Sequence, residues 1–535
     1  MNSTGTQSPR AWPGFNWWVG ILVASYIVVS LAGWTRTLLP DEIRPLILAA
    51  RPPAALLELA RSDLVQTPLS YFVAQGWLTV FGHSDAAAKA LALVIGAATI
   101  VVFAFLARRT TTHWRLATLL CCLVYLRVGT SPNLVRMYGL LVLLATASML
   151  AWDVWRHDPR LSKWLVWAGL SVAAIYTHPS ALLLVGATAI ATGVVGPRRV
   201  AFIAAAAIPM LAILPWVGFV LPVYQDRGIE ANVGALADDP IRETARMPFY
   251  FLTGDPPGGG SPLETRYMRG DWSLLRRAAL AVAVAFGLVA LRGVLTRKPF
   301  VSLARDDDVR LVSNFLLVAV PAAVLLLVSL VSQPVMSARY LLVSLPAMLL
   351  LIAQLTGISG RPGRVMAAIV TLWILISAGY SLKLNRAPAF ARESSRYLDT
   401  HLEQNDIIIA AHHWAIGWEY YWEWNRRLGR TEPVNILPGE QPEWLRDILP
   451  ARDLDSLSLD TVQRIWLLSL RRILTEDVTA ELAGRGFERV ESPDTAVRNM
   501  QFLMLFTRIP GEPGSTGGPA ESAAPVLTDS TYQTE

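Results

Sequence analysis

Long runs of apolar residues, separated by short polar segments, occupy most of the first 385 positions of the chain. A helix of about 20 apolar residues crosses about 30 Å of hydrocarbon, and most of these runs approach or exceed that length. The shortest runs are 162–177 and 179–196. The pattern predicts about eleven membrane-spanning helices, at 15–35, 85–107, 114–130, 134–154, 162–177, 179–196, 199–223, 275–296, 310–332, 340–358 and 364–383.

Composition supports an integral membrane protein. Of 535 residues, 53% are apolar and 16% are charged, and the mean hydropathy is +0.40. Soluble domains average about 25% charged residues. The net charge of +6 fits Lys and Arg kept in cytoplasmic loops, so no nucleic-acid partner is predicted. The first apolar run lacks a cleavage site and is predicted to be an anchor, and the adjacent Cys121 and Cys122 match no disulfide or metal spacing.

The distribution of basic residues predicts the orientation of the chain in the membrane. With residues 1–14 in the cytoplasm, each of the five inner loops holds two or more Lys or Arg residues, and the short outer loops hold only Arg127, Arg136 and Arg339. Arg276 and Arg277, at the predicted outer start of the span 275–296, favour the opposite orientation. Cytoplasmic loops are enriched in Lys and Arg. We therefore predict a multi-pass protein of the plasma (inner) membrane with a cytoplasmic N-terminus and an extracytoplasmic C-terminus.

Three regions are predicted to lie outside the lipid, all on the external face. They are a first loop (36–84), a Gly- and Pro-rich second loop (224–273) and a C-terminal region. Alternating short apolar runs and helical patterns predict a small α/β domain at 390–510, followed by a disordered tail at 511–535. The expected elements of that domain are helices at 391–403 and 475–485 and strands at 406–411, 464–470 and 501–506. The fold class is thus an α-helical polytopic membrane domain (15–385) with a C-terminal α/β domain.

Polar residues from four separate parts of the chain are predicted to meet at the outer membrane level. Ionisable groups at the ends of spans are costly unless they are paired or functional. Simpler explanations exist for each of them. The arginines could reach lipid head groups, the histidine could cap a helix, and the acids could cap the helix that follows. The residues are Asp41 and Glu42, Arg136 and Tyr138, His178, and Arg339 and Tyr340.

A carboxylate and arginines at one depth suit transfer of a sugar from a lipid phosphate. Guanidinium groups match phosphate oxygens bidentately, so the phosphate can leave without a proton donor. The acceptor hydroxyl still needs a base, which Asp41 would provide. Direct displacement would invert the anomeric centre. A divalent cation bridging the carboxylate and the phosphate is possible, and no cofactor is otherwise predicted.

Several short motifs occur in an order that resembles a known family. They are the acidic pair after the first span, the segment Asp63–Phe72, Val135–Tyr138, Tyr176–His178 and Arg339–Pro346. This order is similar to that of the GT-C membrane glycosyltransferases, in the branch of protein O-mannosyltransferases and aminoarabinose transferases, over about residues 15–385. The resemblance implies a polyprenyl-phosphate sugar donor and an envelope glycan, lipid or protein as acceptor.

The resemblance also implies roles for particular residues. Asp41, with Glu42, falls on the catalytic carboxylate of the family, and Arg136 and Tyr138 fall beside the donor site, as do Arg339 and Tyr340. His178, Asp63 and Tyr71 are further candidates. The sequence departs from the family in two places. Leu134 replaces an acid two residues before the arginine, and Gln66 stands where relatives often have His or Lys.

Two alternatives to a glycosyltransferase remain open at this point. One is a transporter or lipid flippase, although the chain has no convincing internal repeat and its polar residues gather at one face rather than at the midplane. The other is an inactive scaffold with a glycosyltransferase-like fold, which the change to Leu134 allows. The aromatic run from Trp414 to Trp424 could stack on sugars or pack in the core of the C-terminal domain.

Overall fold

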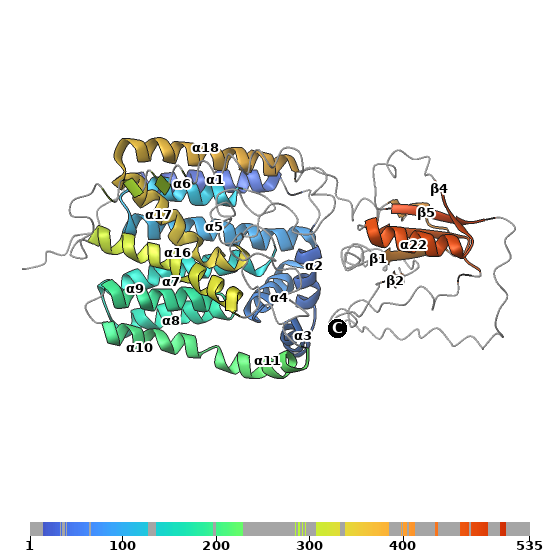
Figure 1. Cartoon of the computed structure of the whole chain (residues 1–535), viewed down its shortest axis with the longest axis horizontal. Coiled ribbons are helices and arrows are strands. Elements are labelled where there is room, and N and C mark those ends of the chain that lie inside the picture. Colours follow the sequence, from blue (N-terminus) through green and yellow to red (C-terminus); the bar gives the residue numbers. More distant parts are fainter. Residues whose placement is uncertain are drawn as a thin grey trace, which may run out of the picture.

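The computed structural model describes two kinds of architecture, a helical bundle and a mixed β-sheet (Figure 1). The described residues are 14–32, 40–63, 66–126, 135–195, 199–227, 306–331, 338–384, 406–411, 434–436, 461–469, 472–490 and 503–509, with isolated positions between them. Several predicted segments lie outside these residues: 1–13, most of the second loop (228–273), nearly all of the span 275–296, the aromatic run from Trp414 to Trp424 and the tail 511–535.

The helices of the bundle follow the apolar runs of the sequence. Each predicted span other than 275–296 coincides with a helix or a helix pair. The elements are α1 (Phe15–Ala32), α5 (Asp85–Thr110), α6 (Trp114–Tyr125), α7 (Met137–His157), α8 (Leu161–Ile175), α9 (Ala181–Val195), α10 (Arg199–Leu211), α11 (Leu214–Arg227), α16 (Asp306–Val331), the 3₁₀ helix η2 (Ala338–Ser344), α17 (Leu345–Ile358) and α18 (Gly360–Leu384).

Not all of these helices are long enough to cross a membrane. Among the described residues, five are long and apolar enough. A sixth span is possible if Ile203–Leu211 and Leu214–Val223, bent by 41° at their junction, count as one. Helix α6 has 12 residues where the sequence predicted a span of 114–130, and α8 and α9 have 15 each. The chain is therefore a polytopic helical membrane protein whose shorter helices lie beside full spans.

The first loop contains three short helices that cover one end of the bundle. They are α2 (Pro40–Ala49), α3 (Pro53–Asp63) and α4 (Leu69–Phe81), and they lie together at the right-hand end of the bundle in Figure 1. Side chains fix them to one another and to the spans. Gln75 on α4 donates to the carbonyl oxygens of Ala49 (3.3 Å) and Arg51 (2.6 Å), and Arg61 on α3 donates to the carbonyl oxygen of Phe219 on α11 (2.8 Å).

The C-terminal region forms a five-stranded sheet in the order β2-β1-β3-β5-β4. Strands β1, β2 and β3 are parallel, and β5 runs antiparallel to both β3 and β4. One face of the sheet packs on helix α22 (Arg472–Gly484) through a buried apolar cluster that includes Ile465, Phe506 and Leu482. The strands are β1 (Ile407–Ala411), β2 (Val434–Ile436), β3 (Arg464–Ser469), β4 (Phe487–Val490) and β5 (Leu503–Arg508).

The sheet agrees with the sequence in part. Strands β1, β3 and β5 and helix α22 coincide with predicted elements, whereas β2 and β4 were not predicted. In Figure 1 the sheet lies beyond the end of the bundle at which α2, α3 and α4 lie. The carboxylate of Asp406 before β1 accepts hydrogen bonds from Arg464 and Trp466 on β3, both at 2.9 Å, which fixes the start of the sheet.

Candidate active site

The acidic pair lies in the first turn of α2. Glu42 is completely buried, and its Oε1 accepts a hydrogen bond from the backbone N–H of Val135 at 2.9 Å. This contact joins positions 93 residues apart and holds the residue that immediately precedes Arg136. Asp41 lies on the adjacent position of α2, and its side chain is outside the described part of the structure. The acidic pair therefore lies beside the start of α7.

Four of the predicted site residues form a row of contacts between the start of α7, the turn before α9 and η2. The guanidinium carbon of Arg136 lies 5.3 Å from the ring centre of Tyr138. The Tyr138 ring lies 5.8 Å from the ring of His178, which in turn lies 5.2 Å from the ring of Tyr340. Three sequence segments predicted to end at the same membrane level thus meet in space, and Glu42 joins a fourth through Val135.

His178 is held as a neutral imidazole in the turn between α8 and α9. The backbone N–H of Ser180 donates to its Nδ1 at 3.1 Å, so Nδ1 carries no proton and the proton lies on Nε2. Burial, and secondly the positive charge of Arg136, lowers the pKa of His178 to about 3. Within the described residues, the buried Nε2 has no hydrogen-bond partner. His178 therefore has one N–H donor that a ligand could accept from.

Backbone contacts attach the first loop to the same turn. Thr67 donates through its hydroxyl to the carbonyl oxygen of Ile175 at 2.9 Å, and the N–H of Leu69 donates to the carbonyl oxygen of Tyr176 at 2.8 Å. The hydroxyl of Tyr176 donates to the carbonyl oxygen of Ala212 at 2.9 Å, at the junction of α10 and α11. The start of α4 and His178 therefore share one rigid support.

A cavity lies between α2, α4, α5 and the start of α7. It contains about 490 Å³ of empty space, part of it open to the surroundings. Three of its lining side chains are polar, namely Arg136, Gln66 and Ser70. Within the described residues, Gln66 Oε1 and Ser70 Oγ are buried and have no hydrogen-bond partner. The rest of the lining is apolar or backbone, from Pro45, Leu46, Val73, Ala74, Leu91, Ala92, Ile95, Val135, Met137, Gly139 and Leu140.

The remaining predicted site residues have less defined positions relative to the cavity. Arg339 precedes Tyr340 in η2 and is half-buried. Tyr71 is completely buried in α4 and belongs to the main apolar core rather than to the cavity lining. Asp63 is the last residue of α3, and its side chain lies outside the described part. Among the described residues, no group of three or more His, Cys, Asp or Glu side chains could hold a metal ion, so the divalent cation remains a prediction.

Sequence reasoning did not assign Gln66 and Ser70 to the site. Both are neutral, and Gln66 differs from the residue that the family pattern led us to expect. A signal was nevertheless present. An amide and a hydroxyl spaced four residues apart, on either side of Pro68, are polar groups close to the apolar residues that begin α4. Such groups need a partner when they are buried, which makes them candidates for contact with a ligand.

Comparison with known proteins gives a fold but no close relative. No family model matches the sequence, and no curated protein does. Among solved structures, ArnT from Cupriavidus metallidurans in the apo state is similar over 94% of this chain and 99% of its own, with a TM-score of 0.54 and 12% identity. ArnT bound to undecaprenyl phosphate matches over 94% of this chain and 100% of its own, with a TM-score of 0.47 and 15% identity. The apo likeness confirms the predicted resemblance at the level of fold, and the chain has the fold of ArnT, an aminoarabinose transferase of the GT-C type.

Proposed function

We propose that the protein is a membrane glycosyltransferase that moves a sugar from a polyprenyl-phosphate donor to an acceptor hydroxyl at the outer face of the plasma membrane. The observation that carries the proposal is the cavity. It combines a guanidinium group, an amide and a hydroxyl with a long apolar lining, and it lies beside α2, which carries Asp41 in its first turn. A lipid phosphate has the same division into a charged head and an apolar chain.

Arg136 is proposed to receive the phosphate. Its guanidinium group lines the cavity and is oriented by the ring of Tyr138 at 5.3 Å. The hydrogen bond between Glu42 and Val135 fixes the backbone immediately before it. Gln66 and Ser70 supply neutral polar groups from the opposite element, so the phosphate oxygens would be bound by both charged and neutral partners.

The transfer step uses Asp41 as the base. As the oxygen of the acceptor hydroxyl forms its bond to the anomeric carbon, its proton passes to the Asp41 carboxylate. The bond between the anomeric carbon and the phosphate oxygen breaks, and its electron pair leaves with the polyprenyl phosphate, whose charge Arg136 balances. The acceptor attacks from the side opposite the phosphate, so the anomeric configuration inverts. Glu42 acts in this scheme by positioning, because its Oε1 accepts from a backbone N–H.

His178 is proposed to bind the donor through its Nε2–H. A neutral imidazole can donate one hydrogen bond without adding charge, which suits a sugar hydroxyl or a phosphate oxygen. Tyr138 and Tyr340 lie on either side of the histidine, with ring centres 5.8 and 5.2 Å from it. They hold the ring in place, and Tyr340, which is only partly buried, presents apolar surface on which a sugar ring could pack.

The test is transfer of radiolabelled sugar from a panel of polyprenyl-phosphate donors to envelope acceptors, with purified wild type, Asp41→Asn and Glu58→Gln. Glu58 is a matched control because it is an exposed acid in the same loop, on α3. We expect transfer by wild type and Glu58→Gln and none by folded Asp41→Asn. Equal transfer by all three proteins would remove Asp41 from the reaction. Donor lipid that crosses the membrane without sugar transfer would instead identify a flippase, and inactivity with every donor would favour the scaffold.

A further inference from the structure

A second polar cavity lies at the other end of α5 and α7. It contains about 290 Å³ of empty space, part of it open to the surroundings. Its lining includes Leu106 and Thr110 at the end of α5, and Met149, Trp152, Asp153 and Arg156 at the end of α7. The 21 residues of α7 rise about 30 Å, which is the thickness of the hydrocarbon core. The two cavities therefore lie at opposite surfaces of the membrane.

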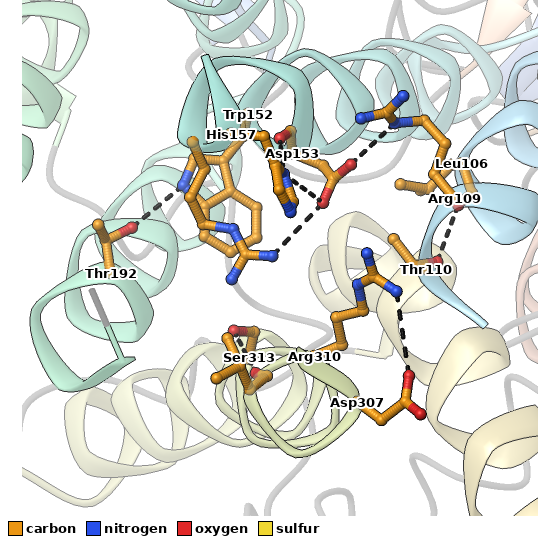
Figure 2. A network of polar contacts seen from close by, with 12 residues as sticks. Leu106, Arg109, Thr110, Trp152, Asp153, His157, Thr192, Asp307, Arg310 and Ser313 are labelled. Atoms are coloured by element: carbon orange, nitrogen blue, oxygen red, sulfur yellow. Dashed lines mark hydrogen bonds and ion pairs between the residues drawn. The ribbon is translucent and has the colours of Figure 1, made fainter. Parts of the chain in front are cut away.

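Charged side chains from three helices meet at this second cavity, as Figure 2 shows. Asp153 on α7 is buried, and its Oδ2 accepts from Nε of Arg109 on α5 at 2.9 Å, while its Oδ1 lies 3.5 Å from Nη2 of Arg156. Arg310 enters from α16 and also lines the cavity. The charged groups in the lining are thus two guanidiniums, Arg156 and Arg310, and one carboxylate.

Asp153 binds an arginine outside the cavity lining as well as one within it. The Asp153 carboxylate is bound by Arg109, which lies outside the cavity lining. The backbone carbonyl oxygen of Asp153 forms a hydrogen bond with Nδ1 of His157 at 2.7 Å. Arg310 contacts Asp307 at 4.0 Å, and the side chain of Asp307 is 71% exposed, so that pair is weak. The lining side chains therefore comprise two positively charged groups and one negatively charged group.

A purely structural role explains only part of this arrangement. The contacts between Arg109, Asp153 and Arg156 tie α5 to α7 and account for the buried carboxylate. They do not account for Arg310, whose Nε is buried and, within the described residues, has no hydrogen-bond partner. The buried Asp308 lies in the same turn of α16 but does not line the cavity.

The other polar and apolar lining residues suit one kind of group. Asn314 lines the cavity, and its Nδ2 donates to Oε1 of Gln354 at 3.1 Å. The Nε2 of Gln354 in turn donates to the carbonyl oxygen of Thr110 at 3.2 Å. The side chains of Leu106, Met149 and Trp152 provide an apolar wall. Two guanidinium groups beside such a wall match a phosphate group, which accepts several charge-assisted hydrogen bonds from planar donors.

We propose that this second cavity binds a phosphate group, held by Arg156 and Arg310, at the membrane surface opposite the proposed transfer site. The phosphate can come from the head group of an anionic phospholipid or from free inorganic phosphate. The proposal is independent of the transfer reaction, because none of the cavity residues belongs to the candidate active site.

The test is binding of defined lipids to the purified full chain in detergent, measured by native mass spectrometry. Phosphatidylglycerol is compared with phosphatidylcholine of the same acyl chains, for wild type, the double variant Arg156→Gln/Arg310→Gln and the control Arg361→Gln/Arg364→Gln. The control removes the same charge from two exposed arginines near the start of α18, at the same end of the bundle. We expect wild type and the control to retain phosphatidylglycerol, and the double variant to retain roughly tenfold less.

A second arm identifies the source of the phosphate and guards against misfolding. If inorganic phosphate binds wild type and the control, but not the double variant, and no lipid preference appears, the site takes the free ion. Ser313→Leu narrows the cavity without changing charge, because Ser313 is a buried lining residue, and it should also weaken binding. The proposal is overturned if the double variant and Ser313→Leu bind both phosphatidylglycerol and phosphate as tightly as wild type does.

Discussion

The buried carboxylate of Glu42 allows a sharp distinction between a positioning role and a catalytic one. In the variant Glu42→Gln, the side chain keeps an oxygen at the position of Oε1 that can accept from the N–H of Val135. In Glu42→Ala, that N–H loses this acceptor in a completely buried setting. The two variants therefore differ in whether the start of α7, and with it Arg136, remains fixed.

The expected magnitudes follow from the hydrogen bond. Replacing a charge-assisted hydrogen bond by a neutral one costs about 1 kcal/mol, which corresponds to roughly a fivefold loss of rate if it displaces Arg136. Removing the acceptor costs about 1–3 kcal/mol, because the buried N–H keeps its desolvation penalty, and this corresponds to roughly 5- to 150-fold. We expect Glu42→Gln to remain active and Glu42→Ala to lose both activity and thermal stability.

The assay is sugar transfer under the conditions used for Asp41→Asn, with thermal unfolding in detergent measured on the same preparations. One result would refute the reasoning. If Glu42→Gln unfolds at the wild-type temperature but is as inactive as Asp41→Asn, the negative charge of Glu42 takes part in the reaction itself. A metal ion bound by both acids would be one way to produce that result.

Two further predictions concern His178 and Gly96. His178→Ala should lower kcat/KM by roughly 10- to 100-fold by removing the Nε2–H donor. Because burial and Arg136 lower the pKa of His178 to about 3, the neutral form persists at all higher pH values. The wild-type pH profile should then show no inflection near the ordinary histidine value of about 6.5, and an inflection that disappears in His178→Ala would contradict the neutral assignment. A Cβ at Gly96 would lie 2.1 Å from the hydroxyl oxygen of the buried Tyr26, so Gly96→Ala should destabilise the bundle by about 1–3 kcal/mol. Gly169→Ala is the control, because nothing lies within 4 Å of the added carbon. Equal unfolding temperatures for the two variants would show that the side chains around Tyr26 rearrange to admit the added methyl group.

The fold was largely predictable from the sequence because one physical requirement dominates it. Backbone groups in hydrocarbon must form hydrogen bonds within the segment, so each apolar run predicts a helix. Helix lengths were less predictable. In the described part of the run at 114–130, helix α6 has 12 residues, and apolarity alone does not distinguish a full span from a shorter buried helix. Strands β2 and β4 have three and four residues, too few for an alternating pattern to appear.

The candidate site was predictable only where charge marked it. Topology placed Arg136 and His178 at one membrane level, and the structure brings both into one row with Tyr138 and Tyr340. The contact between Glu42 and Val135 was not predictable, because it joins a side chain to a backbone N–H across 93 residues. The signal for the second cavity was present but unused. Asp153 is an acid near the end of an apolar run, with Arg156 three residues later.

The two hydrogen bonds from Thr67 and Leu69 to the end of α8 have a consequence for how substrates affect one another. They couple the start of α4, which includes Ser70 of the cavity wall, to the turn that holds His178, so the two move together. In the proposed reaction, an acceptor that shifts α4 would therefore also shift His178, whose Nε2–H is proposed to donate a hydrogen bond to the sugar or phosphate. The affinities for donor and acceptor should then be energetically coupled, and by thermodynamic reciprocity each would change the dissociation constant of the other by the same factor.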